Sequence, residues 1–482
     1  KGNNYEEALA LIEGQGRTLI RLGEFSTVMS WIEQLPDEYV QKSAIIILIK
    51  AVCYTGMDNF EKAWQCVGSA ELLINNEAFL HKPAYTELLL TKANLYYRTG
   101  DIKNLPPTLN KAATSSATDS IHRSYTDFNF FEISAYRAPT ENFIKALRQN
   151  PGIYHSFIRD YRRIITINPG YAPLVEGEFY YESGKLDEAL PKLIASADEA
   201  VNANCLGALV PAMVTMAKIR RAKGDIRGAL EVVGECQDRV AKLHKPHWNY
   251  LLKAFKMRLY IDMNHDEMLD KWLIENKLSV FQDNIRTHEY ELIVLARVLI
   301  RKKRYDDANI LLTRLLSFAE GQKRNHSIVE IANLFAITAM KNLNEEMGEK
   351  YLEKALSIGI GEGYVRSFVD ELAPMVSLLA TYTGSHKKAT RLTAYAKKLL
   401  SLTKEAVRHS MLPAGLGPVE EHLTSMEKKV LQLLINACTN NEIAGELGIT
   451  LRTVKAHTGS IYKKLGVKTR VQCIKKVVGT TV

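Results

Sequence analysis

The chain has 482 residues, a formal net charge of +9, 46% hydrophobic residues and 24% charged residues. This composition excludes a disordered chain, a collagen-like chain and a disulfide scaffold. Gly and Pro together account for 42 residues, below the usual ~12% share, which favours long helices over a strand-and-turn protein. No apolar run approaches the ~18 residues of a membrane span, so we expect no membrane partner.

The start of the chain and its cysteines bear on its context. The chain begins at Lys1-Gly2 rather than at Met, without a basic-then-apolar signal region, so we expect it to be part of a longer protein. The six cysteines show neither CxxC nor metal-ligand spacing, which indicates a reducing, cytoplasmic location and no metal site. Phosphate-loop, dinucleotide-binding, zinc-protease and nucleophile-elbow motifs are also missing. We therefore expect no catalytic residues and no cofactor in this chain.

Residues 1–408 show a repeating helical pattern. Apolar residues recur at helical spacing on both sides of a polar turn at Lys302–Asp307, which indicates two helices joined as a hairpin. Small residues twelve apart flank that turn at Ala296 and Ala308. Similar pairs begin at residues 51, 93, 135, 177, 217, 257, 336 and 377, in steps of 39 to 42 residues. We predict an all-α, tetratricopeptide-like superhelix of ~40-residue helix hairpins.

Turn residues separate the paired positions. Gly and Asn tolerate the left-handed backbone that ends a helix. We expect them to do so at Gly56, Gly100, Gly184, Gly224, Asn264, Asn342 and Gly384.

A superhelix of this kind has a concave groove that suits a small-molecule inducer or a protein partner. The segment Tyr125–Tyr181 holds 13 of the 40 aromatic residues. One interpretation is a ligand pocket, because aromatic faces stack on planar molecules and sugars. The other, which we favour, is that large rings fill gaps between less regular repeats. The candidate ligand-binding residues are Tyr136, Tyr154, Phe157, Tyr161, Tyr180 and Tyr181.

Residues 409–422 carry two Pro and two Gly without a helical stripe and are predicted to form a linker. Positive charge concentrates in and beyond this region. The segment from Leu423 to the end has ten Lys/Arg and three Asp/Glu, a net charge of +7. The segment His386–His422 has seven Lys/Arg and three Asp/Glu, a net charge of +4. Since the whole chain carries +9, the remaining residues are nearly neutral, with a net charge of −2. A basic tail favours a polyanionic partner, nucleic acid before membrane; a merely solvated helix face is the alternative.

Residues 423–482 read as a set of short capped helices. Thr424 to Glu427 and Thr439 to Glu442 each form a capping box, and Thr450 and Thr469 each precede a further helix. The segment Gly448–Thr450 joins two short helices, as in a helix-turn-helix whose second helix enters the major groove of DNA.

The residues predicted to contact double-stranded promoter DNA lie mostly on the second helix of this motif. They are Thr439, Asn440, Thr450, Arg452, Thr453, Lys455, Ala456, His457, Ser460, Lys463 and Lys464. The buried side of that helix is expected to hold Val454, Thr458 or His457, Ile461 and Leu465.

Leu423–Ile474 resembles the LuxR-type DNA-binding domain. The matching motifs are L-T-x-x-E from Leu423, N-x-E-I-A from Asn440, L-x-I-T from Leu447, T-V-K-x-H from Thr453 and I-Y-x-K-L-G-V from Ile461. The chain departs from the family pattern at Met426, Ala437, Gly459 and Thr469.

A long helical-repeat region before such a domain is similar to the large ATP-binding LuxR-family regulators of the MalT type. Lys1–Pro36 looks like the helical stretch that follows their nucleotide-hydrolysing module. The resemblance implies ATP as a cofactor of a module absent from this chain, and inducer binding by the superhelix. It also implies that Val471, Ile474 and Val478, which share one side of the last helix, mediate dimerisation or higher assembly on DNA. RNA polymerase is a further candidate partner.

Two functions remain open from the sequence. In the first, the chain is a DNA-binding transcriptional regulator whose superhelix senses an inducer or a partner. In the second, it is a protein–protein scaffold whose tail is vestigial or binds protein. The basic excess and Lys455 favour the first.

Overall fold

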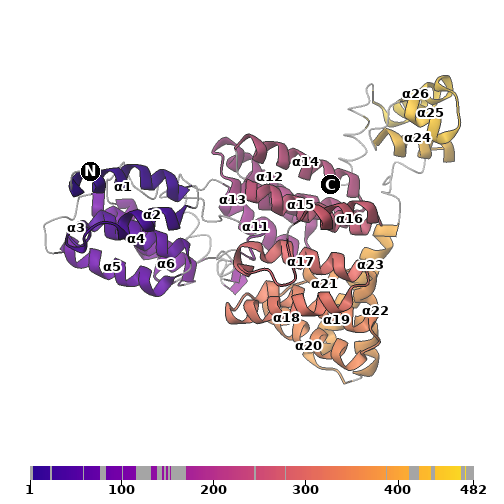
Figure 1. Cartoon of the computed structure of the whole chain (residues 1–482). Helices are drawn as coiled ribbons and strands as arrows, with labels where there is room; N and C mark the ends of the chain where they lie inside the picture. The colour runs from indigo at the N-terminus through magenta and orange to yellow at the C-terminus, as the bar shows by residue number, and fades with distance from the viewer. Residues whose placement is uncertain are drawn as a thin grey trace.

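The computed structural model describes most of the chain, and the following is confined to that part. The described residues are 4–21, 24–57, 59–75, 83–99, 101, 103–114, 132–137, 144–145, 148–149, 152, 170–243, 246–276, 278–386, 388–411, 423–435, 440–467 and 473. Throughout these residues the fold is all-α, with no strand. Figure 1 shows three groups of helices in chain order, coloured indigo to purple, magenta to orange, and yellow.

The first group contains seven helices. They are α1 (Tyr5–Arg21), α2 (Phe25–Glu33), α3 (Asp37–Val40), α4 (Ala44–Gly56), α5 (Phe60–Asn75), α6 (Pro83–Thr99) and α7 (Leu105–Thr114). Helix α4 lies between two small cores: Ile46 and Ile49 face α1 and α2, whereas Ile47, Leu48 and Ala51 face α5 and α6. The residues expected to follow a nucleotide-hydrolysing module thus form helices α1 and α2.

The second group is a superhelix of helix hairpins (Figure 1). Its helices are α11 (Tyr171–Glu182), α12 (Leu186–Asn202), α13 (Leu206–Ala222), α14 (Ile226–Lys242), α15 (Pro246–Asp262), α16 (Asp266–Glu275), α17 (Ile285–Arg301), α18 (Tyr305–Gly321), α19 (Asn325–Lys341), α20 (Glu345–Glu362), α21 (Arg366–Val369), α22 (Ala373–Ser385) and α23 (Arg391–Met411). Helix α23 thus extends three residues beyond the expected boundary at 408, into the expected linker, whose remaining residues lie outside the described part.

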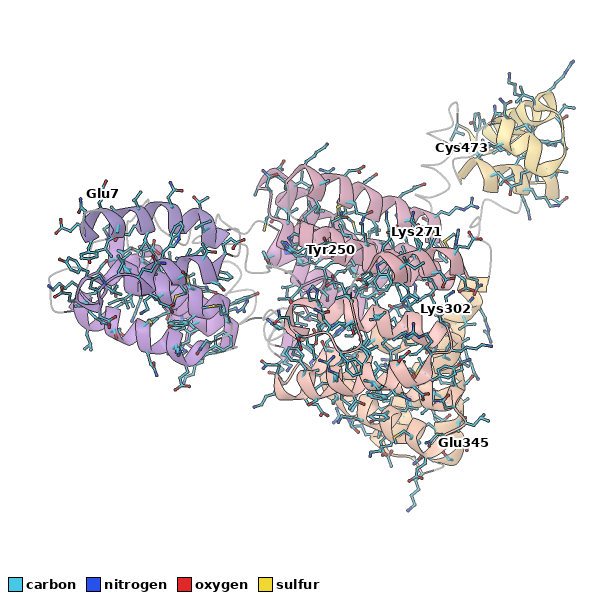
Figure 2. The ribbon with its side chains drawn as sticks, in the orientation of Figure 1. Glu7, Tyr250, Lys271, Lys302, Glu345 and Cys473 are labelled. Atoms are coloured by element: carbon cyan, nitrogen blue, oxygen red, sulfur yellow. The ribbon has the colours of Figure 1, made fainter. Side chains whose placement is uncertain are left out.

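The two helices of each hairpin bury different amounts of surface. Helices α13, α17 and α19 are buried on nearly every side, whereas α12, α14, α18 and α20 each bury a single stripe. The first helix of each hairpin therefore forms an inner row and the second an outer row. Tyr250, Lys271 and Glu345 are exposed on this group (Figure 2).

The predicted register of the repeat is confirmed along most of the chain. The paired positions of seven hairpins fall on the first and second helix of one hairpin: 51/63, 93/105, 177/189, 217/229, 257/269, 296/308 and 336/348. The pair 377/389 fits less well, since residue 389 precedes α23, and the pair 135/147 cannot be placed because 147 lies outside the described residues.

The turn predictions are partly wrong. Gly184, Gly224 and Asn264 have positive φ as expected, but the left-handed residue near Asn342 is Leu343, at φ 56°. Gly56 is the last residue of α4 and Gly384 the last but one of α22, so both lie at a helix end as expected. Neither has positive φ, however, so the left-handed backbone predicted there is wrong. Gly100 lies outside the described residues.

Gly177 shows why a small residue is needed where the helices cross. A Cβ atom built at Gly177 would lie 2.7 Å from Cγ of Leu193, a side chain that is fully buried. At Gly234, in the middle of α14, an added Cβ atom would meet nothing within 4 Å. The two glycines therefore differ in packing although both are helical.

We predict that Gly177→Ala and Gly234→Ala shift stability in opposite directions. Alanine at 177 forces α11 and α12 apart, at a cost of about 1–3 kcal/mol that outweighs a helix-propensity gain of about 1 kcal/mol. Alanine at 234 brings the same gain in helix propensity without a steric cost, because its Cβ atom meets no neighbour. Thermal unfolding followed by circular dichroism should show a lower Tm for the first variant and a higher Tm for the second. A higher Tm for both would contradict the close crossing.

Candidate functional site

The third group of helices forms a small helix-turn-helix unit (Figure 1). Its helices are α24 (Ser425–Ile435), α25 (Asn440–Leu447) and α26 (Leu451–Leu465). Their shared core contains Val430, Leu431, Ile443, Val454 and Ile461, all with no exposed side-chain surface. Cys473 packs into the same core (Figure 2). A core of its own holds the three helices in a fixed relation to one another.

The turn between α25 and α26 is built as the sequence predicts. Gly448 has φ 63°, a left-handed conformation that favours glycine and ends α25. The hydroxyl oxygen of Thr450 then caps α26 by accepting a hydrogen bond from the backbone N–H of Thr453 at 3.1 Å. Gly466 ends α26 at φ 63°. Start and end of the recognition helix are thus both set by local sequence.

The two sides of α26 separate as expected. Val454, Thr458, Ile461 and Leu465 are buried, and the Thr458 hydroxyl donates to the backbone carbonyl of Val454 at 2.8 Å. This resolves the alternative at the third position of the inner face in favour of Thr458, since His457 is only half-buried.

The opposite side of α26 offers the predicted DNA-contacting residues to solvent. Arg452, Lys455, Ala456, Lys463 and Lys464 are exposed, and Thr453, His457 and Ser460 are half-buried. Of the two predicted residues near the start of α25, Asn440 is half-buried and Thr439 lies outside the described residues. The exposed cations of α26 form a basic face that can meet a phosphate backbone while Lys455 and Arg452 reach base edges.

Ser460 and Lys464 make a contact that the sequence did not reveal. The Ser460 hydroxyl donates to Oε1 of Glu427 at 2.6 Å, and Nζ of Lys464 lies 2.6 Å from its Oε2. Glu427 also completes the capping box of α24, accepting from the Thr424 N–H at 2.7 Å. One carboxylate therefore starts α24 and joins it to α26. DNA contact by Ser460 or Lys464 stays a prediction. It would compete with the contacts that these two side chains make with the Glu427 carboxylate.

A second candidate site lies inside the superhelix. A pocket of about 70 Å³ opens between the inner helices α11, α13, α15, α17 and α19 and the segment around α21. Its walls combine aromatic rings with charged side chains. The lining residues are Arg137, Tyr181, Glu182, Lys218, Arg221, Phe255, Arg258, Tyr290, Arg297, His326, Glu330, Arg366, Ser367, Asp370 and Glu371.

Two segments of the chain itself fill the interior beside this pocket. Arg137 reaches Ser327 on α19 at 3.1 Å and ion-pairs with Glu330. On the other side, the backbone N–H groups of Val365 and Ser367 donate to Glu182 at 2.9 and 2.8 Å. The groove that the sequence predicts for a partner is thus occupied in part by residues 132–137 and 364–371. The pocket is the space they leave.

The candidate aromatic residues fall into different places. Tyr181 lines the pocket, and its hydroxyl donates to Asp370, with burial raising the pKa of the phenol. Tyr136 is buried instead against His326 and Tyr364, with ring centroids 5.1 and 5.4 Å away. Tyr180 lies outside the pocket, under Nζ of Lys185. Tyr154, Phe157 and Tyr161 lie outside the described residues.

The charged walls of the pocket were not predicted from the sequence, although the sequence contains a signal for them. The residue after the first paired position is ionisable in four consecutive repeats: Glu178, Lys218, Arg258 and Arg297. Because the inner helices repeat every ~40 residues, these side chains recur on the same face. Three of the four line the pocket, and Glu178 is buried next to it.

Comparison with known proteins finds a family match for two parts of the chain. Residues 169–385 match the family model described as MalT-like TPR region, and residues 421–477 match the model described as bacterial regulatory proteins, luxR family. The chain is MalT-like, with a LuxR-family domain at its C-terminal end. None of its described helices has the length and hydropathy that would let it cross a membrane.

Among the relatives is the HTH-type transcriptional regulator MalT of Serratia proteamaculans, 23% identical over 63% of this chain and 35% of that protein. The regulator of the same name from Yersinia pestis is 24% identical over 55% of this chain and 31% of that protein. The MalT-like chain thus spans about a third of the length of these relatives. The solved TPR domain of P58(IPK) aligns with 84% of the chain at 14% identity and a TM-score of 0.22, too low to support any conclusion.

We predict that Glu427→Gln lowers the stability of the helix-turn-helix unit. Hydrogen bonds from Lys464, Ser460 and the Thr424 N–H lower the pKa of Glu427 to about 2. The stabilisation is therefore present above the ordinary carboxyl pKa and is lost as pH falls through the lowered one. Removing charge-assisted bonds of this kind costs about 1.5–3 kcal/mol.

The rate of limited proteolysis of the C-terminal unit at neutral pH measures this loss of stability. Glu446→Gln is the control variant. Glu446 is exposed and near the end of α25. We expect faster cleavage between α24 and α26 in Glu427→Gln alone. Equal cleavage rates of the wild type and Glu427→Gln would show that the Glu427 contacts do not stabilise the helix-turn-helix unit.

Proposed function

We propose that this chain is the sensing and DNA-binding part of a transcriptional regulator. The observation that carries the proposal is the division of α26, whose inner side is buried in the domain core while Arg452, Lys455 and Lys463 are exposed on its outer side. Such a helix can enter the major groove without losing its own packing. The names of its relatives, which are HTH-type transcriptional regulators, support the same function.

The superhelix supplies the sensing part of the proposal. Its interior holds a polar pocket whose walls come from five hairpins and from the segment around α21. A ligand there contacts helices far apart in the sequence, so its binding free energy can favour one arrangement of the superhelix over another. We propose a small-molecule inducer as occupant, in preference to a protein segment, because the chain's own segments leave only a small cavity.

We propose further partners for this regulator. We propose that ATP binds a module that precedes this chain, and that the DNA-bound form is a dimer or a higher assembly that engages RNA polymerase. Assembly through Val471, Ile474 and Val478 rests on their spacing in the sequence, since all three lie outside the described residues. A regulator of this kind acts in the cytosol, where its DNA is.

The test of DNA binding is its salt dependence. Each phosphate contact made by a Lys or Arg changes the slope of log K against log salt concentration by about −0.9. With four exposed cations on α26, of which Lys464 also pairs with Glu427, we expect a slope steeper than about −2 for a labelled duplex selected by this chain from a random pool. Fluorescence anisotropy gives the affinities. No binding even at low salt would favour the protein-scaffold function instead.

We predict that Lys455→Ala weakens binding to the selected duplex by about 1–3 kcal/mol, the range for loss of a base-edge contact. Lys455 is exposed on the outer side of α26, one turn from its start. Lys429→Ala is the matched control, because Lys429 is an exposed lysine on α24, off the recognition helix.

The same anisotropy titration should show reduced discrimination between selected and scrambled duplexes for Lys455→Ala only. Circular dichroism establishes that both variants are folded. If Lys455→Ala keeps full discrimination, the docking face is assigned to the wrong side of α26.

A further inference from the structure

The interior pocket carries more positive than negative charge on its walls. Six Lys/Arg residues and four Asp/Glu residues line it. Two carboxylates behind the wall add to this network, since Asp262 ion-pairs with Arg221 and Glu289 with Arg137. Which wall cation lacks a carboxylate partner follows from the contacts of the individual side chains.

Lys218 is that cation. Its Nζ lies 5.8 Å from the ring centroid of Tyr181, and among the described residues it has no carboxylate within ion-pair distance. Glu178 lies close enough to affect Lys218 electrostatically, but both of its oxygens are engaged elsewhere. Oε2 accepts from Ser134 Oγ and the Ala135 N–H at 2.7 Å, and Oε1 accepts from Thr215 at 3.0 Å. Half-buried Lys218 is thus left facing the pocket.

Two buried nitrogen atoms of the wall also lack hydrogen-bond partners. They are Nε of Arg366 and Nδ1 of His326, in residues only 7% and 8% exposed. The rest of each side chain is fixed: Arg366 ion-pairs with Asp370, and Nε2 of His326 lies 3.2 Å from Ser367 Oγ. Leaving a buried polar group unsatisfied is unfavourable. Because both atoms have almost no accessible surface, an acceptor in the pocket meets them only where the wall relaxes around it.

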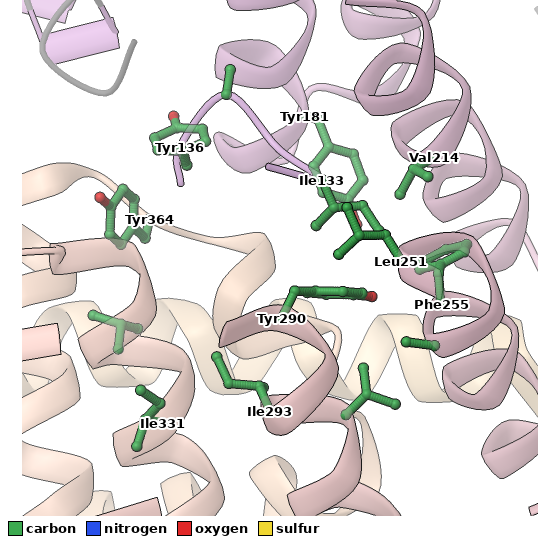
Figure 3. Packing of buried hydrophobic residues seen from close by; sticks show 14 of the residues in the cluster. Ile133, Tyr136, Tyr181, Val214, Leu251, Phe255, Tyr290, Ile293, Ile331 and Tyr364 are labelled. Carbon is green, nitrogen blue, oxygen red and sulfur yellow. The ribbon is translucent and has the colours of Figure 1, made fainter. Parts of the chain in front are cut away.

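Arg258 and three aromatic residues complete the wall of the pocket. Burial and the neighbouring Arg297 lower the pKa of Arg258, so this side of the pocket also disfavours additional positive charge. Tyr181, Phe255 and Tyr290 also line the pocket, from α11, α15 and α17. Figure 3 shows their rings among the buried side chains of this region, with Ile133 and Leu251 nearby. A ligand that fits has an anionic head and a compact apolar or ring-shaped remainder.

We propose that the pocket binds a small organic anion, a carboxylate or a phosphate, held by Lys218 in a wall that Arg366 and His326 also line. The cavity volume of about 70 Å³ suits a compact molecule of this size and excludes a long chain. This inference deepens the sensing part of the proposed function and depends on it only for its regulatory meaning.

The experiment measures anion binding to the whole chain at constant ionic strength. Acetate, benzoate and inorganic phosphate are the probes, and glucose is the neutral comparison. Thermal unfolding and isothermal titration calorimetry give the Tm shift and the affinity. We expect a saturable rise in Tm with at least one anion and none with glucose. The carboxylate and phosphate probes separate the two head groups. No response to any anion across the millimolar range, or a response to glucose alone, would overturn the proposal.

Variants at Lys218 tie the binding to this pocket. Lys218→Met keeps the stem and removes the charge, and should weaken the anion about tenfold or more, the loss expected for one charge-assisted bond. Lys218→Arg should retain binding. Lys185→Met is the matched control, because Nζ of Lys185 lies 6.0 Å from the Tyr180 ring outside the pocket, in the same kind of contact.

The control variant should bind like the wild type. Equal responses of Lys218→Met and Lys185→Met would mean that the anions act on the general surface, which rejects the pocket. DNA affinity of the same preparations, measured by anisotropy, keeps the two proposals apart: a chain that binds DNA but no anion contradicts only this inference.

Discussion

The arrangement of the superhelix depends on the buried guanidinium of Arg297. From α17 it donates to Glu371, after α21, at 2.6 Å and to Glu330 on α19 at 2.8 Å. Glu330 in turn holds Arg137, which comes from the first part of the chain. Arg297, Glu371 and Arg137 are buried, and the side chain of Glu330 is only 15% exposed. Removing one of them leaves its partner with an uncompensated charge in the interior, which costs several kcal/mol. Four segments are therefore held in one arrangement.

This network explains why the inside of the superhelix is polar. The inner helices bury nearly all their sides, yet their ionisable residues cannot stay isolated in an apolar interior. Residues 132–137 and 364–371 supply the missing partners and enter the groove to do so. Beside them remain Lys218 and the unsatisfied nitrogen atoms of Arg366 and His326. The charged side chains that stabilise the interior of the superhelix thus also line the pocket for which we propose an anionic ligand.

The helix-turn-helix unit is organised on a smaller scale and by different means. Local signals position its helices: the capping box at Thr424, the left-handed glycines 448 and 466, and the Thr450 cap. Glu427 is the long-range addition, because it holds Ser460 and Lys464 across the domain. A unit with its own core and its own caps can keep its DNA-binding face while the superhelix changes, which suits a sensor coupled to a DNA reader.

The sequence by itself determined the all-α class, the repeat and the recognition helix. These features follow from local periodicity, small residues such as Gly177 at close crossings, and capping residues, all of which act within a few turns of chain. Only the tertiary structure decided which charges meet in the interior. Arg137 and Glu330 are separated by 193 residues, and no local pattern sets such a pair. The ionisable series at 178, 218, 258 and 297 marked the inner face, but its pairing depends on how the hairpins stack and on which segments enter the groove.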